Sequence, residues 1–143
     1  MATKFLRFTL LLAALVSFLA AASFAQTEVR KEPIQMTSAA SGSQMYNSYC
    51  AACHGKDAKG NGPAASSLKE SPTDLTQLAK KNNGKFPADH VANELRNGVG
   101  GAHGSVDMPV WGPLFSSVSS HDDNIVQMRV ANLIHYLESL QAK

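Results

Sequence analysis

The chain contains only two cysteines, and they lie close together in the sequence YCAACHG, directly before a histidine. Cys50, Cys53 and His54 therefore form a CxxCH motif. Residues three apart on a helix share one face, so both sulfur atoms can reach the same edge of a single bound group. Such a motif is compatible with a disulfide, a redox-active dithiol, a zinc site or an attachment site for haem.

Three of these alternatives fit the chain poorly. A disulfide across two intervening residues constrains the unfolded chain very little. A redox dithiol normally opens a helix after a strand, whereas these cysteines close a predicted helix. Zinc requires four ligands, and no second cysteine pair or paired histidine spacing completes that set. Because CxxCH is the attachment signal of c-type haem, we expect one haem c bound covalently through Cys50 and Cys53, with His54 on its iron.

A second iron ligand is expected downstream, in a segment rich in glycine and proline. Met108 lies there between Asp107 and Pro109, where a shaped backbone can bring its sulfur to the opposite face of the haem. His103 shares the segment and is the alternative ligand; a His/His iron would have a lower reduction potential. Met45 and Met128 are interpreted as packing residues.

The N-terminus has the layout of a secretory signal peptide. Lys4 and Arg7 precede an apolar run over residues 8–22, and small residues lie at 23 and 25. This run, about 15 residues long, is shorter than the roughly 20 residues that span a bilayer. We therefore expect a signal peptide over residues 1–25, a flexible leader over 26–41 and one domain over 42–143, in a protein exported to the periplasm.

The charge balance excludes one class of partner. Without Lys4 and Arg7, 11 of the 13 basic residues remain against 11 acidic residues. A chain without surplus positive charge is not expected to bind nucleic acid.

Apolar spacing predicts an all-α fold of short helices. Helices are expected over residues 42–53, from an N-cap at Thr73 to about residue 82, from Pro87 to residue 98, and from a capping box at Ser120 and Asp123 to the C-terminus. Residues 98–120 show neither helical nor strand periodicity and are predicted to form a loop over something apolar.

Over residues 42–140 the chain resembles bacterial class I (His/Met) monohaem c-type cytochromes. Besides CAACH and Met108, the first helix carries Gly42 and Tyr46, and the last carries the Leu-x-x-Tyr pair of Leu133 and Tyr136. The resemblance implies a small cytochrome c fold, with short helices around the haem and these two helices crossing closely at Gly42.

The resemblance also implies roles for two further residues. The Pro63 carbonyl is expected to accept a hydrogen bond from the iron-bound histidine, and Trp111 to pack on the haem or bond a propionate.

In function, the resemblance implies a one-electron carrier between respiratory redox partners, a donor and an acceptor, and not an enzyme. The alternative is a cytochrome c subunit or module of a larger dehydrogenase or terminal oxidase complex. A monomer is expected, in contact with a membrane only through such a complex or an uncleaved N-terminus.

Overall fold

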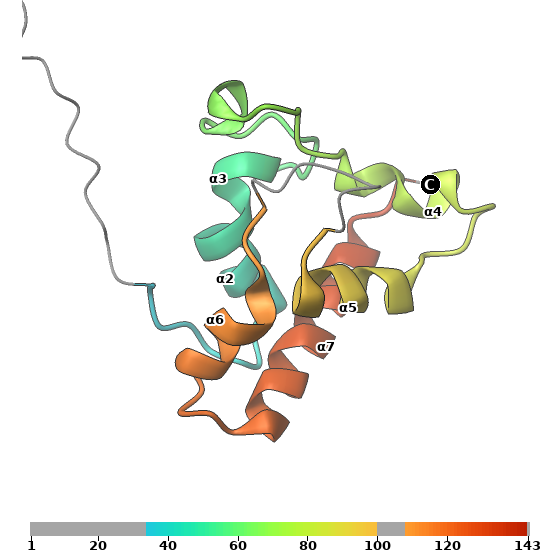
Figure 1. The fold of residues 1–143 in the computed structure, drawn as a ribbon. Coiled ribbons are helices and arrows are strands. Elements are labelled where there is room, and N and C mark those ends of the chain that lie inside the picture. The colour runs from blue at the N-terminus through green and yellow to red at the C-terminus, as the bar shows by residue number, and fades with distance from the viewer. Residues whose placement is uncertain (1–33, 100–107, 143) are drawn as a thin grey trace, which may run out of the picture. The chain divides into compact units, whose positions relative to one another are not determined.

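The computed structural model of the chain describes residues 34–99 and 108–142, which belong to one unit running from Ile34 to Lys143. These residues form helices and no strand (Figure 1), so the predicted all-α class is confirmed. The predicted signal peptide, the start of the leader and the alternative ligand His103 lie outside the described residues. Within those residues, no helix has both the length and the apolar character needed to cross a membrane.

The predicted helix over residues 42–53 is confirmed, with a local irregularity. It consists of α2 (Gly42–Met45), a π-helical turn (Tyr46–Cys50) and α3 (Ala51–His54). Ser41 caps its start by accepting a hydrogen bond from the backbone N–H of Gln44. A π-helical turn holds an extra residue, which simple helical spacing does not anticipate.

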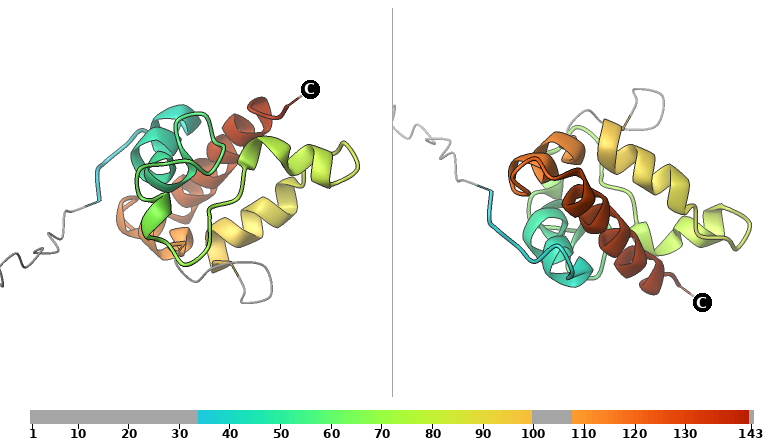
Figure 2. Two further views of the ribbon diagram at one scale, coloured as in Figure 1. Left: turned by 90° about the horizontal axis from the view of Figure 1, so that it is seen from above. Right: turned by 90° about the horizontal axis from the view of Figure 1, so that it is seen from below.

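The C-terminal helix α7 (Asp123–Ser139) packs on α2 and α5 (Figure 2). The crossing with α2 lies at Gly42, where an added Cβ would meet the Asn132 carbonyl and come within 2.7 Å of Tyr136 Cβ. The rings of Tyr46 and Tyr136 lie 5.4 Å apart beside it. The predicted close contact at Gly42 is therefore confirmed.

The cap of α7 differs from the prediction. Asp122 is the N-cap residue, and its carboxylate accepts from the backbone N–H groups of Asn124 and Ile125. Ser120 has a positive φ of 51° and belongs to the preceding turn. The predicted capping box of Ser120 and Asp123 is therefore wrong.

Between these two helices lie short elements and α5 (Ala88–Asn97). A 3₁₀ turn (Ala65–Ser67) follows α3, and a second (Leu75–Gln77) leads into α4 (Leu78–Lys81). The N-cap of the second turn is Asp74, one residue after the predicted Thr73, because its side chain accepts from Thr76 N–H. Helix α5 follows Pro87 and ends at Gly98, whose φ is 82°, close to the predicted range.

Part of the predicted loop over residues 98–120 is helical. Helix α6 (Trp111–Ser117) includes Gly112 and Pro113, which favoured a loop in the sequence. Pro113 is accommodated because it lies in the first turn, where the backbone N–H has no helical partner. Gly112 lets α6 approach α5: an added Cβ would lie 2.5 Å from the Arg96 carbonyl oxygen.

The described end of the predicted leader packs on the domain. Thr37 is buried, and its hydroxyl and carbonyl accept hydrogen bonds of 3.1 and 2.9 Å from the guanidinium of Arg129 on α7. Tyr49 donates to the Gln35 carbonyl at 2.5 Å. From Ile34 onward the chain is therefore part of the domain, whose start the sequence placed at residue 42.

Candidate haem site

An apolar cleft of about 300 Å³ lies between the first helical segment, α5, α7 and the segment after residue 67. Pockets of about this size and larger hold small molecules and cofactors. Among the residues that the structure describes, no lysine or arginine lines it. Its lining includes the following apolar side chains: Leu68, Leu75, Leu78, Val91, Leu95, Leu133 and Leu137.

Both cysteines of the CxxCH motif line this cleft as free thiols. Cys50 ends the π-helical turn and Cys53 lies in α3. Burial, and to a smaller extent Cys53, raises the pKa of Cys50 to about 12, so that thiol is neutral at physiological pH. The two sulfur atoms are therefore available, on one side of the cleft, for covalent attachment of a bound group.

His54, the last residue of α3, also lines the cleft. Its Nδ1 lies 3.0 Å from the carbonyl oxygen of Thr73. Burial lowers the pKa of His54, and the hydrogen bond to Thr73 opposes that shift. Because a carbonyl only accepts, Nδ1 carries the proton and donates, which leaves a lone pair on Nε2 for a metal.

The prediction that the Pro63 carbonyl accepts this bond is wrong, because Thr73 occupies that role. The turn containing Pro63 is hydrogen-bonded to the backbone of α3. Gly62 N–H donates to the Cys53 carbonyl at 3.0 Å, and Ala64 N–H donates to the Ala52 carbonyl at 2.9 Å. Pro63 borders a separate surface hollow with Asn61 and Lys56, and does not line the cleft.

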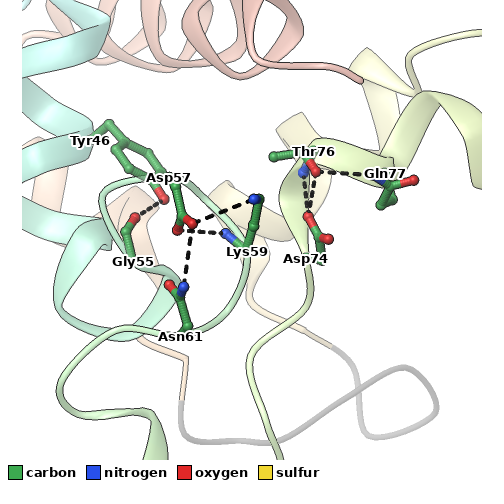
Figure 3. A network of polar contacts seen from close by, with 8 residues as sticks. All are labelled: Tyr46, Gly55, Asp57, Lys59, Asn61, Asp74, Thr76 and Gln77. Atoms are coloured by element: carbon green, nitrogen blue, oxygen red, sulfur yellow. Dashed lines mark hydrogen bonds and ion pairs between the residues drawn. The ribbon is translucent and has the colours of Figure 1, made fainter. Parts of the chain in front are cut away.

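The Thr73 carbonyl is positioned by the loop after His54. Leu75 N–H donates to the Ala58 carbonyl at 2.8 Å, and Gly60, with a φ of 79°, allows the Pro72 carbonyl to lie against it. Figure 3 shows Asp74 bound to Thr76 through both the backbone N–H at 2.9 Å and the hydroxyl at 2.6 Å. These hydrogen bonds lower the pKa of Asp74 and fix the turn beside Thr73.

A buried hydrogen bond connects the same loop to the first helical segment. The Tyr46 hydroxyl, fully buried, donates to the Gly55 carbonyl at 2.6 Å (Figure 3). Burial raises the pKa of Tyr46, and the hydroxyl remains a hydrogen-bond donor. The backbone immediately after His54 is thus held in place.

Met108 lines the same cleft as His54, although 53 residues separate the two in the sequence. Trp111 lines it as well; it is 7% exposed, with its ring centroid 5.4 Å from that of Tyr49 and 5.6 Å from that of Phe115. Met45 is fully buried in the core, as expected, whereas Met128 is 43% exposed and is not a core residue.

Thr73 and Glu94 are two of the cleft residues that the sequence analysis did not assign to the site. Thr73 acts through its backbone carbonyl, which no sequence pattern reveals. Glu94 lines the cleft from α5, three residues after Val91 and next to Leu95. Its place beside these two apolar residues at helical spacing is the signal that could have identified it.

The residues present fit a c-type haem. The cleft is apolar, two free thiols line it, and an imidazole nitrogen and a thioether sulfur, both established iron ligands, border the same space. Among the described residues, no cluster of three or more His, Cys, Asp or Glu side chains could hold a metal ion without such a group.

Comparison with known proteins agrees with this chemistry. Residues 37–137, more than two thirds of the chain, match the family model described as cytochrome c oxidase, cbb3-type, subunit III. Searches of curated proteins and of solved structures return no match. The family is a c-type cytochrome domain that functions in electron transfer, often as a module of the oxidase, and c-type cytochromes are generally exported. The chain belongs to this family of c-type cytochromes, that of subunit III of cbb3-type cytochrome c oxidase.

Proposed function

We propose that the domain carries single electrons on one haem c, attached through Cys50 and Cys53 and bound axially by His54 and Met108. The observation that supports this most strongly is that all four side chains line one apolar cleft. When bound, the haem accepts and releases one electron at its iron.

Each residue has a distinct task in this proposal. Cys50 and Cys53 hold the haem edge covalently. His54 binds iron through Nε2, with its ring orientation fixed by the bond from Nδ1 to Thr73. Met108 binds the opposite face, and its sulfur stabilises the reduced state relative to an imidazole. Trp111, which lines the same cleft, would pack against the haem.

This ligand set makes the domain an electron carrier and not an enzyme. With both His54 and Met108 as ligands, the iron would have no open position for a substrate. The apolar lining limits access of water and lowers the local dielectric constant, which tunes the reduction potential.

The proposed setting is the periplasm, with redox proteins as donor and acceptor. The alternative, which agrees with the description of the family, is that the domain is a module of a terminal oxidase. Size-exclusion chromatography of the protein from its native membrane extract separates the two: a carrier elutes as a monomer, and a module co-elutes with oxidase subunits.

The ligand proposal is tested with the Met108→Ala variant and a matched control, Met128→Ala. Both remove a methionine side chain, but Met128 is on the exposed part of α7 and does not line the cleft. The measurement is the weak far-red absorption band that methionine sulfur gives to ferric haem, in protein matured with haem in an oxidising compartment.

We expect the band in the wild-type protein and in Met128→Ala, and its loss in Met108→Ala. A wild-type protein without the band contradicts the proposal. The His103→Ala variant and carbon monoxide binding to the ferrous protein then distinguish a His/His carrier from an open iron site.

A further inference from the structure

Glu94 is the acidic side chain that α5 presents to the haem cleft. Its side chain is 17% exposed, and its Oε2 is buried without a hydrogen-bond partner among the described residues. A buried carboxylate oxygen without a hydrogen-bond partner is costly when the carboxylate is ionised. Its position in the cleft therefore requires a compensating charge or a proton.

Among the described residues that line the cleft, none carries a permanent positive charge. The other titratable side chains that line the cleft are Tyr49, Cys50, Cys53, His54, Glu70 and His90. Helix α6 carries no charged residue, and α7 lines the cleft only with Leu133 and Leu137. On α5 itself, Asp89 and Arg96 lie outside the cleft lining.

His90 connects Glu94 to solvent. Its Nδ1 lies 3.9 Å from Glu94 Oε1, one helical turn away, and its side chain is 58% exposed. An imidazole exchanges protons with water near neutral pH. His90 thus offers a route by which a proton can travel between solvent and the buried carboxylate.

We propose that Glu94 takes up a proton when the haem iron is reduced, so that this domain couples electron transfer to proton transfer. The inference rests on the haem occupying the cleft, as proposed above. One electron arrives from the redox donor, one proton arrives from solvent through His90, and the carboxylate becomes a carboxylic acid. Oxidation of the iron reverses both transfers, and no other bond changes.

The physical reason is the charge of the iron. A ferric porphyrin carries one net positive charge, and this charge stabilises a nearby carboxylate; a ferrous porphyrin carries none. Reduction therefore leaves the buried Glu94 carboxylate without compensation, and protonation removes its charge. The same interaction makes ionised Glu94 lower the reduction potential.

The test compares the haem-loaded wild-type protein with Glu94→Gln and a matched control, Glu138→Gln. Glu138 also pairs with a histidine on its own helix, His135, at 4.0 Å, but it is 56% exposed. The midpoint potential is measured by optical titration between about pH 4 and about pH 9. Proton uptake on reduction is measured separately with an indicator dye in weakly buffered solution.

We expect the wild-type potential to fall as pH rises, with proton uptake on reduction. Glu94→Gln should have a higher potential at neutral pH, a flatter pH dependence and reduced proton uptake, whereas Glu138→Gln should match the wild type. The proposal is overturned if Glu94→Gln keeps the wild-type pH dependence of the midpoint potential, because the haem carboxylates would then account for the whole of that dependence. It is also overturned by loss of proton uptake in His90→Gln with uptake retained in Glu94→Gln.

The failure of this inference is distinguishable from failure of the proposed function. Absence of proton uptake by the wild-type protein overturns the inference even if no variant folds. The wild-type far-red band reports on the His54 and Met108 ligands independently, since it does not depend on proton uptake.

Discussion

Nδ1 of His54 lies 3.0 Å from the carbonyl oxygen of Thr73, 19 residues further along the chain. The helix that carries His54 ends at this residue, so the helix alone does not fix the imidazole ring. Its orientation depends on the loop that brings Thr73 back to the cleft. The residues that shape this loop should therefore influence the iron without contacting it.

Gly60→Ala is expected to disturb His54 through this loop. Gly60 has a φ of 79°, and an added Cβ would collide with the Pro72 carbonyl, next to Thr73. We expect a loss of about 1–3 kcal/mol in the free energy of unfolding and a changed reduction potential, measured by denaturant titration and optical redox titration of the haem-loaded protein.

The matched control is Gly84→Ala. Gly84 has nearly the same positive φ, 83°, but an added Cβ would have nothing within 4 Å. Because only the positive φ opposes the alanine, Gly84→Ala should lower the free energy of unfolding by about 1 kcal/mol. Its reduction potential should equal that of the wild type. Equal potentials in both alanine variants would show that the position of Thr73 does not matter to the iron.

Gly42→Ala tests the crossing of α2 and α7. The added methyl group would meet the Asn132 carbonyl and Tyr136 Cβ, so the helices must separate. We expect a destabilisation of about 1–3 kcal/mol by denaturant unfolding. Ser48→Ala, at an exposed position of the same segment, should stay within about 0.5 kcal/mol of the wild type; a similar loss in both would contradict close packing at Gly42.

Much of this fold could be predicted because its signals are local. Helical spacing identified α5 and α7, and the glycine at the crossing followed from the resemblance. The misassignments share a cause: a cap depends on which side chain reaches a backbone N–H. Asp74 and Asp122 do so, whereas Thr73 and Ser120 only have the right residue type and spacing.

The candidate site was predictable where side chains carry the chemistry. Cys50, Cys53, His54, Met108 and Trp111 were all named from the sequence, and all line the cleft. Pro63 was misassigned to the histidine hydrogen bond because that bond uses a backbone carbonyl, and any residue type provides one. Only the path of the loop between Gly60 and Leu75 decides which carbonyl reaches His54.

Tyr46→Phe tests the buried hydroxyl under the loop. At neutral pH, loss of the bond to the Gly55 carbonyl should cost about 1–3 kcal/mol. Burial raises the pKa of Tyr46 in the folded protein. The neutral hydroxyl therefore makes its full contribution to the free energy of unfolding below the ordinary tyrosine pKa of about 10, and this contribution is lost as pH rises above that value. The difference between Tyr46→Phe and the wild type should therefore shrink above about pH 10, measured by urea unfolding at several pH values; a constant difference would contradict ionisation in the unfolded state.

The last prediction concerns Arg129, which holds the segment before α2 in place. Arg129 is 3% exposed, and its guanidinium donates to Ser119 Oγ at 3.0 Å and to both oxygens of Thr37. Arg129→Leu leaves those acceptors buried without a donor, so we expect the free energy of unfolding to fall by about 2–4 kcal/mol and amide hydrogen exchange in residues 34–40 to become faster.

Thr37→Val removes only the hydroxyl, which also contacts the Tyr49 hydroxyl at 2.8 Å, and should cost about 1 kcal/mol. Met128→Leu, at the exposed neighbouring position, serves as the control. If exchange in residues 34–40 is the same in Arg129→Leu as in this control, the segment is held by other contacts and Arg129 stabilises only α7.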